Sequence, residues 1–256
     1  MINNMKLLIE DVKKAEYFQI IFQNIKVFSD IFSIDFTEDG IYIQGLDNSH
    51  IVIFEVKLSK DWFSEYEITT NESLGVHGGI ISKVFNTRDN IQHILMETHD
   101  YTIDLSFIHP STSFNKHFRI PLVDFDSEKM TIPETDYDVS MEIDSKEWKK
   151  IIDQLSAFGD SVGFSCNENE FKMITETTEG KMNVSIESSK MEEYTVSEEC
   201  NVNSSFQIKF LQTMTNFHKI NKNIEMKLSN GIPCCCRYKI NEESFIRFYL
   251  APQIDN

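Results

Sequence analysis

The chain has 256 residues, a length that allows one or two domains with a substantial buried core. Its formal net charge of −17 argues, taken alone, against a nucleic-acid partner, because DNA binding requires basic residues that face phosphates. No apolar run approaches the roughly 18 residues of a membrane span, and the first residues lack a signal-peptide pattern. We therefore expect an intracellular protein without a membrane partner.

Four segments have the spacing of helices with one apolar face. In chain order, the predicted helices span 13–26, 82–88, 145–158 and 206–222. Short runs of alternating apolar residues, bounded by turn signals such as Asn230-Gly231, predict strands between them. Together these elements predict an α+β fold with antiparallel sheets and with helices on one face.

The sequence contains an internal repeat of about 130 residues. A gapless shift of 130 positions places the apolar face of the first helix, Phe18, Ile21, Phe22, Ile25 and Phe28, on Trp148, Ile151, Ile152, Leu155 and Phe158. The following strands and the second helix match at the same shift. We interpret this as a duplication, although two unrelated α+β segments also align loosely. We expect an N-terminal domain at 1–123, an extended acidic connector at 124–137 and a C-terminal domain at 138–256.

Charge is distributed unevenly between the helices and the rest of the chain. The four predicted helices hold eleven basic and three acidic residues, a net charge of +8, so the remainder carries −25. In the helix at 145–158, the lysines lie off the apolar face formed around Trp148 and Ile152. Such a surface contacts phosphates without reading sequence. The alternative is an ordinary solvated helix face, and the charge pattern alone does not decide between the two.

The five cysteines fit a reducing compartment. Cys166 and Cys200 are isolated, whereas Cys234, Cys235 and Cys236 are consecutive. Zinc ligands must converge on one point, but adjacent residues of a strand face opposite sides. We therefore expect buried, reduced cysteines and neither a metal nor another cofactor.

Four local strings resemble the proliferating cell nuclear antigen family of DNA sliding clamps, in family order and at family spacing. They are Leu46-Asp47-Asn48-Ser49-His50 within 40–52, Ile132-Pro133-Glu134 within 130–134, Gly159-Asp160 within 155–162 and Leu250-Ala251-Pro252 within 250–254. The resemblance covers nearly the whole chain. It implies a DNA-clamp fold of two similar domains, with antiparallel sheets outside and two helices per domain lining a ring of three head-to-tail subunits.

The resemblance also implies partners and their binding residues. The partners are encircled double-stranded DNA, bound without sequence preference, a clamp loader, and DNA polymerase and other proteins that carry a glutamine-aromatic peptide motif. The implied DNA-facing residues are Lys26, Lys83, Lys149, Lys150 and Lys209, with Lys219 and Lys222 nearby. Because Gln19, Asn86, Asp153 and Asn216 stand where family members often carry basic residues, we expect a less basic hole than usual.

A peptide pocket and a subunit interface are implied in the same way. The pocket set is Leu46, His50, Ile51, Ile53, Met130, Ile132, Pro133, Pro233, Tyr249, Ala251 and Pro252. Without the resemblance, Leu46, Ile53 and Met130 would be interpreted as core. The interface strands are expected near 113–120 and 181–187, with Phe118 and Ile120 on one side and Met182, Val184 and Ile186 on the other. Glu168 stands where eukaryotic members have a ubiquitin-accepting lysine, so that regulation is not expected.

Other functions were weighed against a clamp. Asp47 and His50 could serve acid–base chemistry, but nucleophile, phosphate-loop and metal-helix motifs are missing, so we expect no enzyme. The alternatives are a checkpoint-type hetero-oligomeric clamp subunit and a monomeric or dimeric viral processivity factor. Abundant lysine, asparagine and isoleucine are typical of an AT-rich genome, such as that of a large DNA virus or a protist. We expect location in the nucleus, or at a viral replication site in nucleus or cytoplasm.

Overall fold

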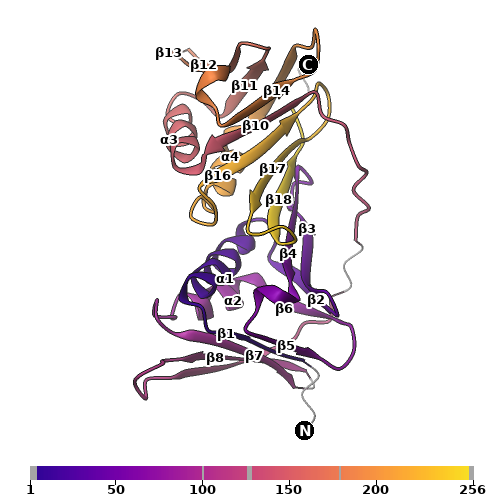
Figure 1. Cartoon of the computed structure of the whole chain (residues 1–256), viewed down its shortest axis with the longest axis vertical. Helices are drawn as coiled ribbons and strands as arrows, with labels where there is room; N and C mark the ends of the chain where they lie inside the picture. Colours follow the sequence, from indigo (N-terminus) through magenta and orange to yellow (C-terminus); the bar gives the residue numbers. More distant parts are fainter. Residues whose placement is uncertain (1–4, 100, 126–128, 179, 254–256) are drawn as a thin grey trace. The chain divides into compact units, whose positions relative to one another are not determined.

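The computed structural model describes residues 5–99, 101–125, 129–178 and 180–253 (Figure 1). Residues 126–128 of the expected connector and residues 254–256 of the tail lie outside the described residues. The chain forms two compact units. The first comprises Met1–Asn48, Glu55–Met130 and Asn241–Phe245, and the second comprises Ser49–Phe54, Thr131–Ile240 and Ile246–Asn256.

The two halves of the chain contain the same elements in the same order. The first half has β1 (Met5–Ile9), α1 (Val12–Asn24), η1 (Ile25–Val27), β2 (Ile31–Thr37), β3 (Gly40–Leu46), β4 (Val52–Ser59), η2 (Lys60–Trp62), β5 (Glu65–Ile68), β6 (Glu72–His77), α2 (Gly78–Phe85), β7 (His93–His99), β8 (Thr102–Ile108) and β9 (Lys116–Pro121). The second half has β10 (Val139–Asp144), α3 (Ser145–Leu155), β11 (Ser161–Cys166), β12 (Glu170–Thr177), β13 (Gly180–Glu187), η3 (Ser188–Lys190), β14 (Glu193–Val196), β15 (Val202–Gln207), α4 (Ile208–Thr215), β16 (Asn223–Leu228), β17 (Cys234–Lys239) and β18 (Phe245–Leu250). Apart from η1, each element of the first half has its counterpart in the second, which confirms the two similar halves expected from the 130-residue shift.

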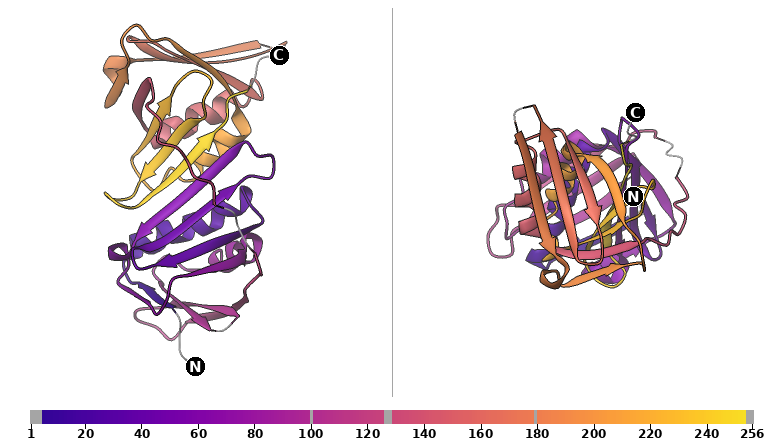
Figure 2. Two further views of the ribbon diagram at one scale, coloured as in Figure 1. Left: turned by 90° about the vertical axis from the view of Figure 1, so that its right-hand side faces the viewer. Right: turned by 90° about the horizontal axis from the view of Figure 1, so that it is seen from above.

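The sheets repeat as well. In the first unit, five strands have the order β5-β1-β7-β8-β9, and β2 pairs with β3 and β6. In the second unit, β14-β10-β16-β17-β18 follow the corresponding order, and β13-β12-β11-β15 form a four-stranded sheet whose strands run side by side in Figure 2. The registered pairs are antiparallel, as expected from the alternating strand pattern.

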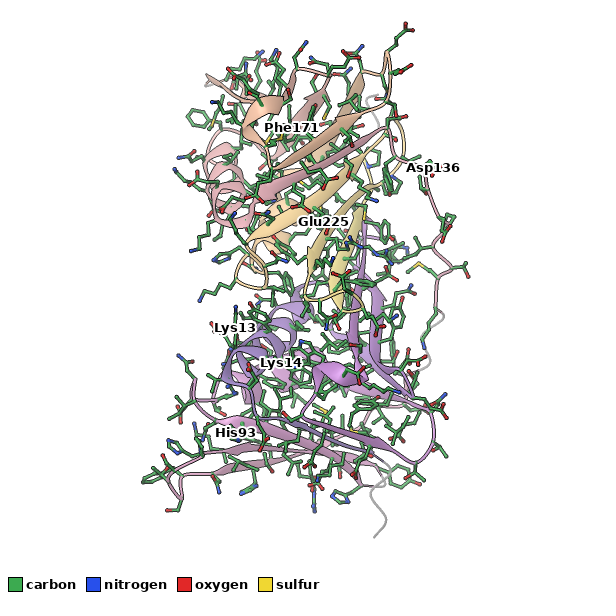
Figure 3. The ribbon with its side chains drawn as sticks, in the orientation of Figure 1. Lys13, Lys14, His93, Asp136, Phe171 and Glu225 are labelled. Atoms are coloured by element: carbon green, nitrogen blue, oxygen red, sulfur yellow. The ribbon has the colours of Figure 1, made fainter. Side chains whose placement is uncertain are left out.

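Aromatic side chains fill the space between helices and strands in each unit. In the first, Phe18 of α1 lies 5.7 Å from Phe85 of α2, measured between ring centroids, and Phe22 stacks on Phe85 at 5.3 Å. In the second, Phe171, labelled in Figure 3, makes an edge contact with Phe164, with ring centroids 5.2 Å apart. These rings are fully buried, and Trp148 of α3 packs edge-on against Phe164 with ring centroids 6.0 Å apart, which joins the helix to the strands.

Two tyrosines hold equivalent turns in the two halves. The Tyr66 hydroxyl donates to the carbonyl oxygens of Thr37 at 2.9 Å and Gly40 at 2.8 Å. The Tyr194 hydroxyl donates to the corresponding carbonyl oxygens of Asn167 at 2.7 Å and Glu170 at 3.0 Å. The duplication therefore extends from the apolar pattern to individual polar contacts.

The helix boundaries differ from the sequence prediction, most of all at the start of α2 and the end of α4. α2 begins at Gly78, four residues before the predicted start, at a position where a Cβ would lie 3.0 Å from the Ser29 carbonyl oxygen. Glycine fits this tight space without displacing a neighbour, although glycine is a poor helix former. α4 ends at Thr215, seven residues before the predicted end, and the tight turns that follow bond His218 N–H to the Thr215 carbonyl at 3.1 Å. The helix predicted at 145–158 likewise ends earlier, at Leu155.

These boundaries change the charge partition. The four α-helices hold seven basic and three acidic residues, a net charge of +4 where the sequence had predicted +8. Arg88, counted in the prediction, follows α2 and is 4% exposed, so it adds nothing to a basic surface. The helices remain the basic part of the chain, but less strongly.

Four of the five cysteines are buried and Cys200 is half-buried; all five are free thiols. Burial raises the pKa of Cys166 and Cys235 to about 12. Within the described ranges, no group of three or more His, Cys, Asp or Glu side chains is placed to hold a metal ion. None of the described helices is both long and apolar enough to cross a membrane.

Candidate functional site

The helices of each unit display lysines away from their buried faces. Lys26 on η1 and Lys83 on α2 are exposed in the first unit, and Lys209 on α4 is exposed in the second. The Lys209 ammonium lies 4.7 Å from the centroid of the Phe210 ring, a cation–π contact that restrains it. At the start of α1, Figure 3 shows Lys13 and Lys14, and Lys14 Nζ donates to the Trp62 carbonyl at 2.8 Å.

α3 carries the densest lysine cluster of the described helices. Asp144 caps its first turn by accepting from the backbone N–H groups of Lys146 at 2.9 Å and Glu147 at 3.0 Å. Trp148 is fully buried, which turns Lys149 and Lys150 outward. Their ammonium groups lie 2.9 Å from Asp153 and 3.4 Å from Glu147, so two carboxylates on the same helix partly offset them.

Lys219 and Lys222 lie off the helix on which they had been expected. Lys219 is exposed in the turn after α4, and Lys222 immediately precedes β16. Lys222 pairs with Glu192, and the hydrogen bond between them raises the pKa of the lysine. Its charge is therefore already engaged within the second unit.

The connector is anchored to the first unit at its described ends. The Val123 N–H donates to the Gly75 carbonyl at 2.9 Å, and a Cβ on Gly75 would lie 2.3 Å from the Val123 carbonyl oxygen. Lys129 pairs with the buried Asp35. The Gln44 amide accepts from Met130 N–H at 2.7 Å and donates to its carbonyl at 3.0 Å. These contacts fix the backbone on which the expected pocket residue Met130 sits.

Contacts within the second unit order other residues of the expected pocket. Ala251 N–H donates to the Ile51 carbonyl at 3.0 Å. The Tyr137 hydroxyl donates to the Pro233 carbonyl at 3.2 Å, and the Arg247 guanidinium lies 5.3 Å from the centroid of the Tyr249 ring. Tyr137 was not among the predicted residues. The sequence feature that could have identified Tyr137 is its position four residues after the predicted pocket residue Pro133.

Exposure and backbone conformation distinguish the pocket set from ordinary core. All eleven residues are half-buried or exposed, including Leu46, Ile53 and Met130, which sequence reasoning alone would have placed in the core. His50 has φ of 59°, a left-handed conformation that is uncommon for residues other than glycine and is found preferentially at functional sites. Leu46 and Met130 belong to the first unit and the other nine residues to the second.

The predicted interface residues lie on two outermost strands. β9 is the last strand of its five-stranded sheet and β13 the first of its four-stranded sheet. Met182, Val184 and Ile186 are half-buried on one face of β13, as is Phe118 on β9, whereas Ile120 is 2% exposed. Phe158, which the sequence had placed on the apolar face of the helix at 145–158, instead follows α3, is 45% exposed and lies 3.9 Å from the Cβ position of Gly180 at the start of β13.

Comparison with known proteins identifies the family. Residues 7–132 match the family model of the proliferating cell nuclear antigen N-terminal domain, and residues 131–253 match that of the C-terminal domain. The chain is 28% identical over 227 residues to the proliferating cell nuclear antigen of Chaetomium thermophilum, covering 86% of this chain and 88% of the relative. The chain belongs to the proliferating cell nuclear antigen family. It is a two-domain sliding clamp, and its mostly antiparallel sheets with few helices are those of the clamp fold.

Gln19 and Gln23 on α1 of this clamp have uncharged amide side chains, and both amides are hydrogen-bonded. Gln19 Nε2 donates to the Phe85 carbonyl at 2.9 Å, and Gln23 Nε2 donates to Asn86 Oδ1 at 2.8 Å. Both bonds tie α1 to the end of α2. In this proliferating cell nuclear antigen homologue, these uncharged side chains therefore brace the helix pair of the first unit.

Proposed function

We propose that three copies of this chain close head-to-tail into a ring that encircles duplex DNA and holds a polymerase and other partners on it. The ring acts as a scaffold rather than as an enzyme, and a loader opens it. Retention depends on topology more than on charge, because the α-helices carry only +4 in total. The place of action is the nucleus, or a viral replication site in nucleus or cytoplasm.

The equivalence of the strands is the observation that carries the ring proposal. In the second unit, the chain leaving β18 bonds to the segment entering β4, through Ala251 N–H and the Ile51 carbonyl. In the internal repeat, β9 corresponds to β18 and β13 corresponds to β4. However, β9 and β13 are each the outermost strand of a sheet, whereas β18 and β4 are neighbours. Pairing β9 of one copy with β13 of the next satisfies both edges by backbone hydrogen bonds. Phe118 would then pack against Met182, Val184 and Ile186 across the boundary.

The same assembly gives the lysines a role. Lys26, Lys83, Lys149, Lys150 and Lys209, with Lys219 nearby, contact phosphates without base recognition. Lys222 contributes least because Glu192 already pairs with it. Contacts of this kind are weak and salt-sensitive, which permits sliding.

Double reversal of Lys149 and Lys150 to Glu tests this role. The expected result is loss of stimulation of a cognate polymerase on circular primed DNA with the ring still assembled. The matched control reverses Lys190 and Lys227, which are exposed on η3 and β16 and give the same change in net charge. Full stimulation by the first variant contradicts the role of α3.

We further propose that the pocket set binds a short peptide with a glutamine and aromatic anchors. An apolar set with few polar handles suits such anchors. Partial exposure of all eleven residues and the strained His50 backbone support the assignment. Tyr137 extends the pocket wall beside Pro233.

Ile132→Asp tests the pocket, because a carboxylate there has to be desolvated when an apolar anchor docks. Binding of a glutamine-aromatic peptide, measured by calorimetry, should be abolished. Thr131→Asp places the same charge on the exposed neighbouring residue and should leave binding within about twofold. Unchanged affinity for Ile132→Asp contradicts the pocket.

A further inference from the structure

A basic hollow lies in the second unit between α3 and the turn that follows α4. It has a volume of about 420 Å³ and is lined by Lys146, Lys149, Lys150, Asp153, Gln154 and His218. Lys146, Lys149 and Lys150 are spaced i, i+3 and i+4, which places them on neighbouring positions of one helix surface. Three lysines and one aspartate give the lining a charge of +2 before His218 is counted.

The first unit has a side chain where the second has this hollow. Arg88 stands 130 positions before His218, and both follow their helix in the same turn: Arg88 N–H bonds to Phe85 at 3.2 Å, and His218 N–H bonds to Thr215 at 3.1 Å. The Arg88 guanidinium reaches Gln19 Oε1 at 2.7 Å and the Gln92 carbonyl at 2.9 Å, and the residue is 4% exposed. The shorter histidine leaves the corresponding space of the second unit open.

The chemistry of the wall identifies the class of ligand. Gln19, whose side chain accepts from Arg88 in the first unit, corresponds to Lys149 in the second. The hollow of the second unit is therefore lined by a cationic lysine at the position where the first unit has an uncharged amide. A second cation in the hollow would be repelled, whereas an anion would be attracted. The lining matches a phosphate group, which is anionic and accepts several hydrogen bonds.

The donors available to such a group are also set by the structure. His218 Nδ1 donates to the Thr215 carbonyl at 2.9 Å, so Nε2 is the ring nitrogen left for a ligand. Lys149 is held at 2.9 Å by Asp153, whereas Lys150 lies a longer 3.4 Å from Glu147 and its side chain is 62% exposed. The lining groups that can donate to a phosphate are therefore Lys146, Lys150 and, in its imidazolium form, His218 through Nε2.

We propose that this hollow is a phosphate-binding notch formed by Lys146, Lys150 and His218, and that its ligand is a backbone phosphate of the encircled DNA. The choice of DNA as the source rests on the proposed function, whereas the notch rests on the geometry of the second unit alone. Two of its residues, Lys146 and His218, were not predicted from the sequence. The second repeat thereby has a phosphate contact, whereas in the first repeat the Arg88 side chain fills the equivalent space.

The test is the affinity of the full-length protein for a fluorescent duplex, measured by anisotropy across a salt series. His218→Asn retains a donor near Nδ1 and removes Nε2, and Lys146→Gln removes an ammonium. Each should weaken binding about threefold to tenfold and lower the salt slope by about 0.9. Lys190→Gln, an exposed lysine on η3, is the matched control and should affect binding less. Thermal unfolding of each variant checks that the second unit stays folded.

The outcomes separate this inference from the proposed function. If the wild type binds duplex but both notch variants bind it with the affinity of the Lys190→Gln control, the notch proposal is wrong and the proposed clamp function is unaffected. If the wild type does not bind duplex at low salt, DNA encirclement itself fails. A second titration uses pyrophosphate at matched ionic strength. Micromolar binding of pyrophosphate that is lost in both variants would assign the notch to a free phosphate compound instead of DNA.

Discussion

Gln44 holds both backbone groups of Met130, accepting from its N–H at 2.7 Å and donating to its carbonyl at 3.0 Å. Gln44 lies on β3 and is 7% exposed, whereas Met130 lies 86 positions later, within the expected connector. A rigid strand thus fixes one residue of a long irregular segment. This pre-ordering lowers the entropy that the connector itself would lose if it binds the proposed peptide.

Gln44→Leu should therefore weaken peptide binding although Gln44 is not itself among the predicted pocket residues. We expect a loss of affinity of about threefold to tenfold by calorimetry, because the connector must be ordered on binding. Gln154→Leu, on the exposed surface of α3, serves as the control. Equal affinity of Gln44→Leu and wild type would show that the hydrogen bonds between Gln44 and Met130 have no part in peptide recognition.

Tyr66 and Tyr194 should contribute equally to stability, because each hydroxyl bonds two carbonyl groups at equivalent turns. Replacement of either by Phe should cost about 1–2 kcal/mol of unfolding free energy. Tyr101→Phe, at a side chain that is 84% exposed, should be neutral. Urea denaturation measures all three variants, and a neutral Tyr194→Phe would argue against the equivalence of the two turns.

Arg88 should be far more important for stability than its counterpart His218. Burial is the main cause that lowers the pKa of Arg88 to about 10, yet the group stays charged at neutral pH. Arg88→Met leaves buried acceptors such as the Gln92 carbonyl unpaired, and we expect a loss of about 3 kcal/mol in urea denaturation. His218→Met should cost less than about 1 kcal/mol. Similar losses for the two variants would contradict the contrast between a filled and an open space.

Acid should release the ion pair that joins β8 to the edge strand β9. Arg119 hydrogen-bonds to Asp104 at 2.8 and 2.6 Å, which holds the pKa of Asp104 below its usual value of 3.8. A lowered folded-state pKa contributes stability above the usual value and loses it as pH falls through the folded value. Because Arg119 is 70% exposed, Asp104→Asn should cost under about 1 kcal/mol at pH 7. Thermal unfolding should show this difference shrink as the pH falls below 3.8 and Asp104 becomes protonated, and a constant difference would refute the linkage.

Much of the fold was predictable because its signals are local. The apolar faces around Phe18 and Trp148 repeat at helical spacing, and their equivalence at one shift indicated two similar domains before any contact was known. The start of α2 was not predictable, because glycine is a poor helix former and the tight space beside Ser29 that suits Gly78 leaves no local pattern. The end of α4 was missed because the apolar pattern continues through Phe217 and Ile220 in turns.

The candidate site was predictable only in part. The family strings located the pocket residues, but the hydrogen bonds of Gln44 and Tyr137 join positions 86 and 96 residues apart, which no local pattern reveals. Arg88 and His218 illustrate the same limit for charge. Both are basic residues at equivalent positions, yet one is buried by its neighbours and the other lines an open hollow.

The mass of the assembly in solution tests the central claim most directly. If β9 and β13 pair between copies as proposed, multi-angle light scattering at micromolar concentration should give three times the subunit mass of 29.9 kDa. Phe118→Arg, at a half-buried position of β9, should shift this mass toward that of one subunit. A wild-type protein that remains at 29.9 kDa throughout would contradict the closed ring.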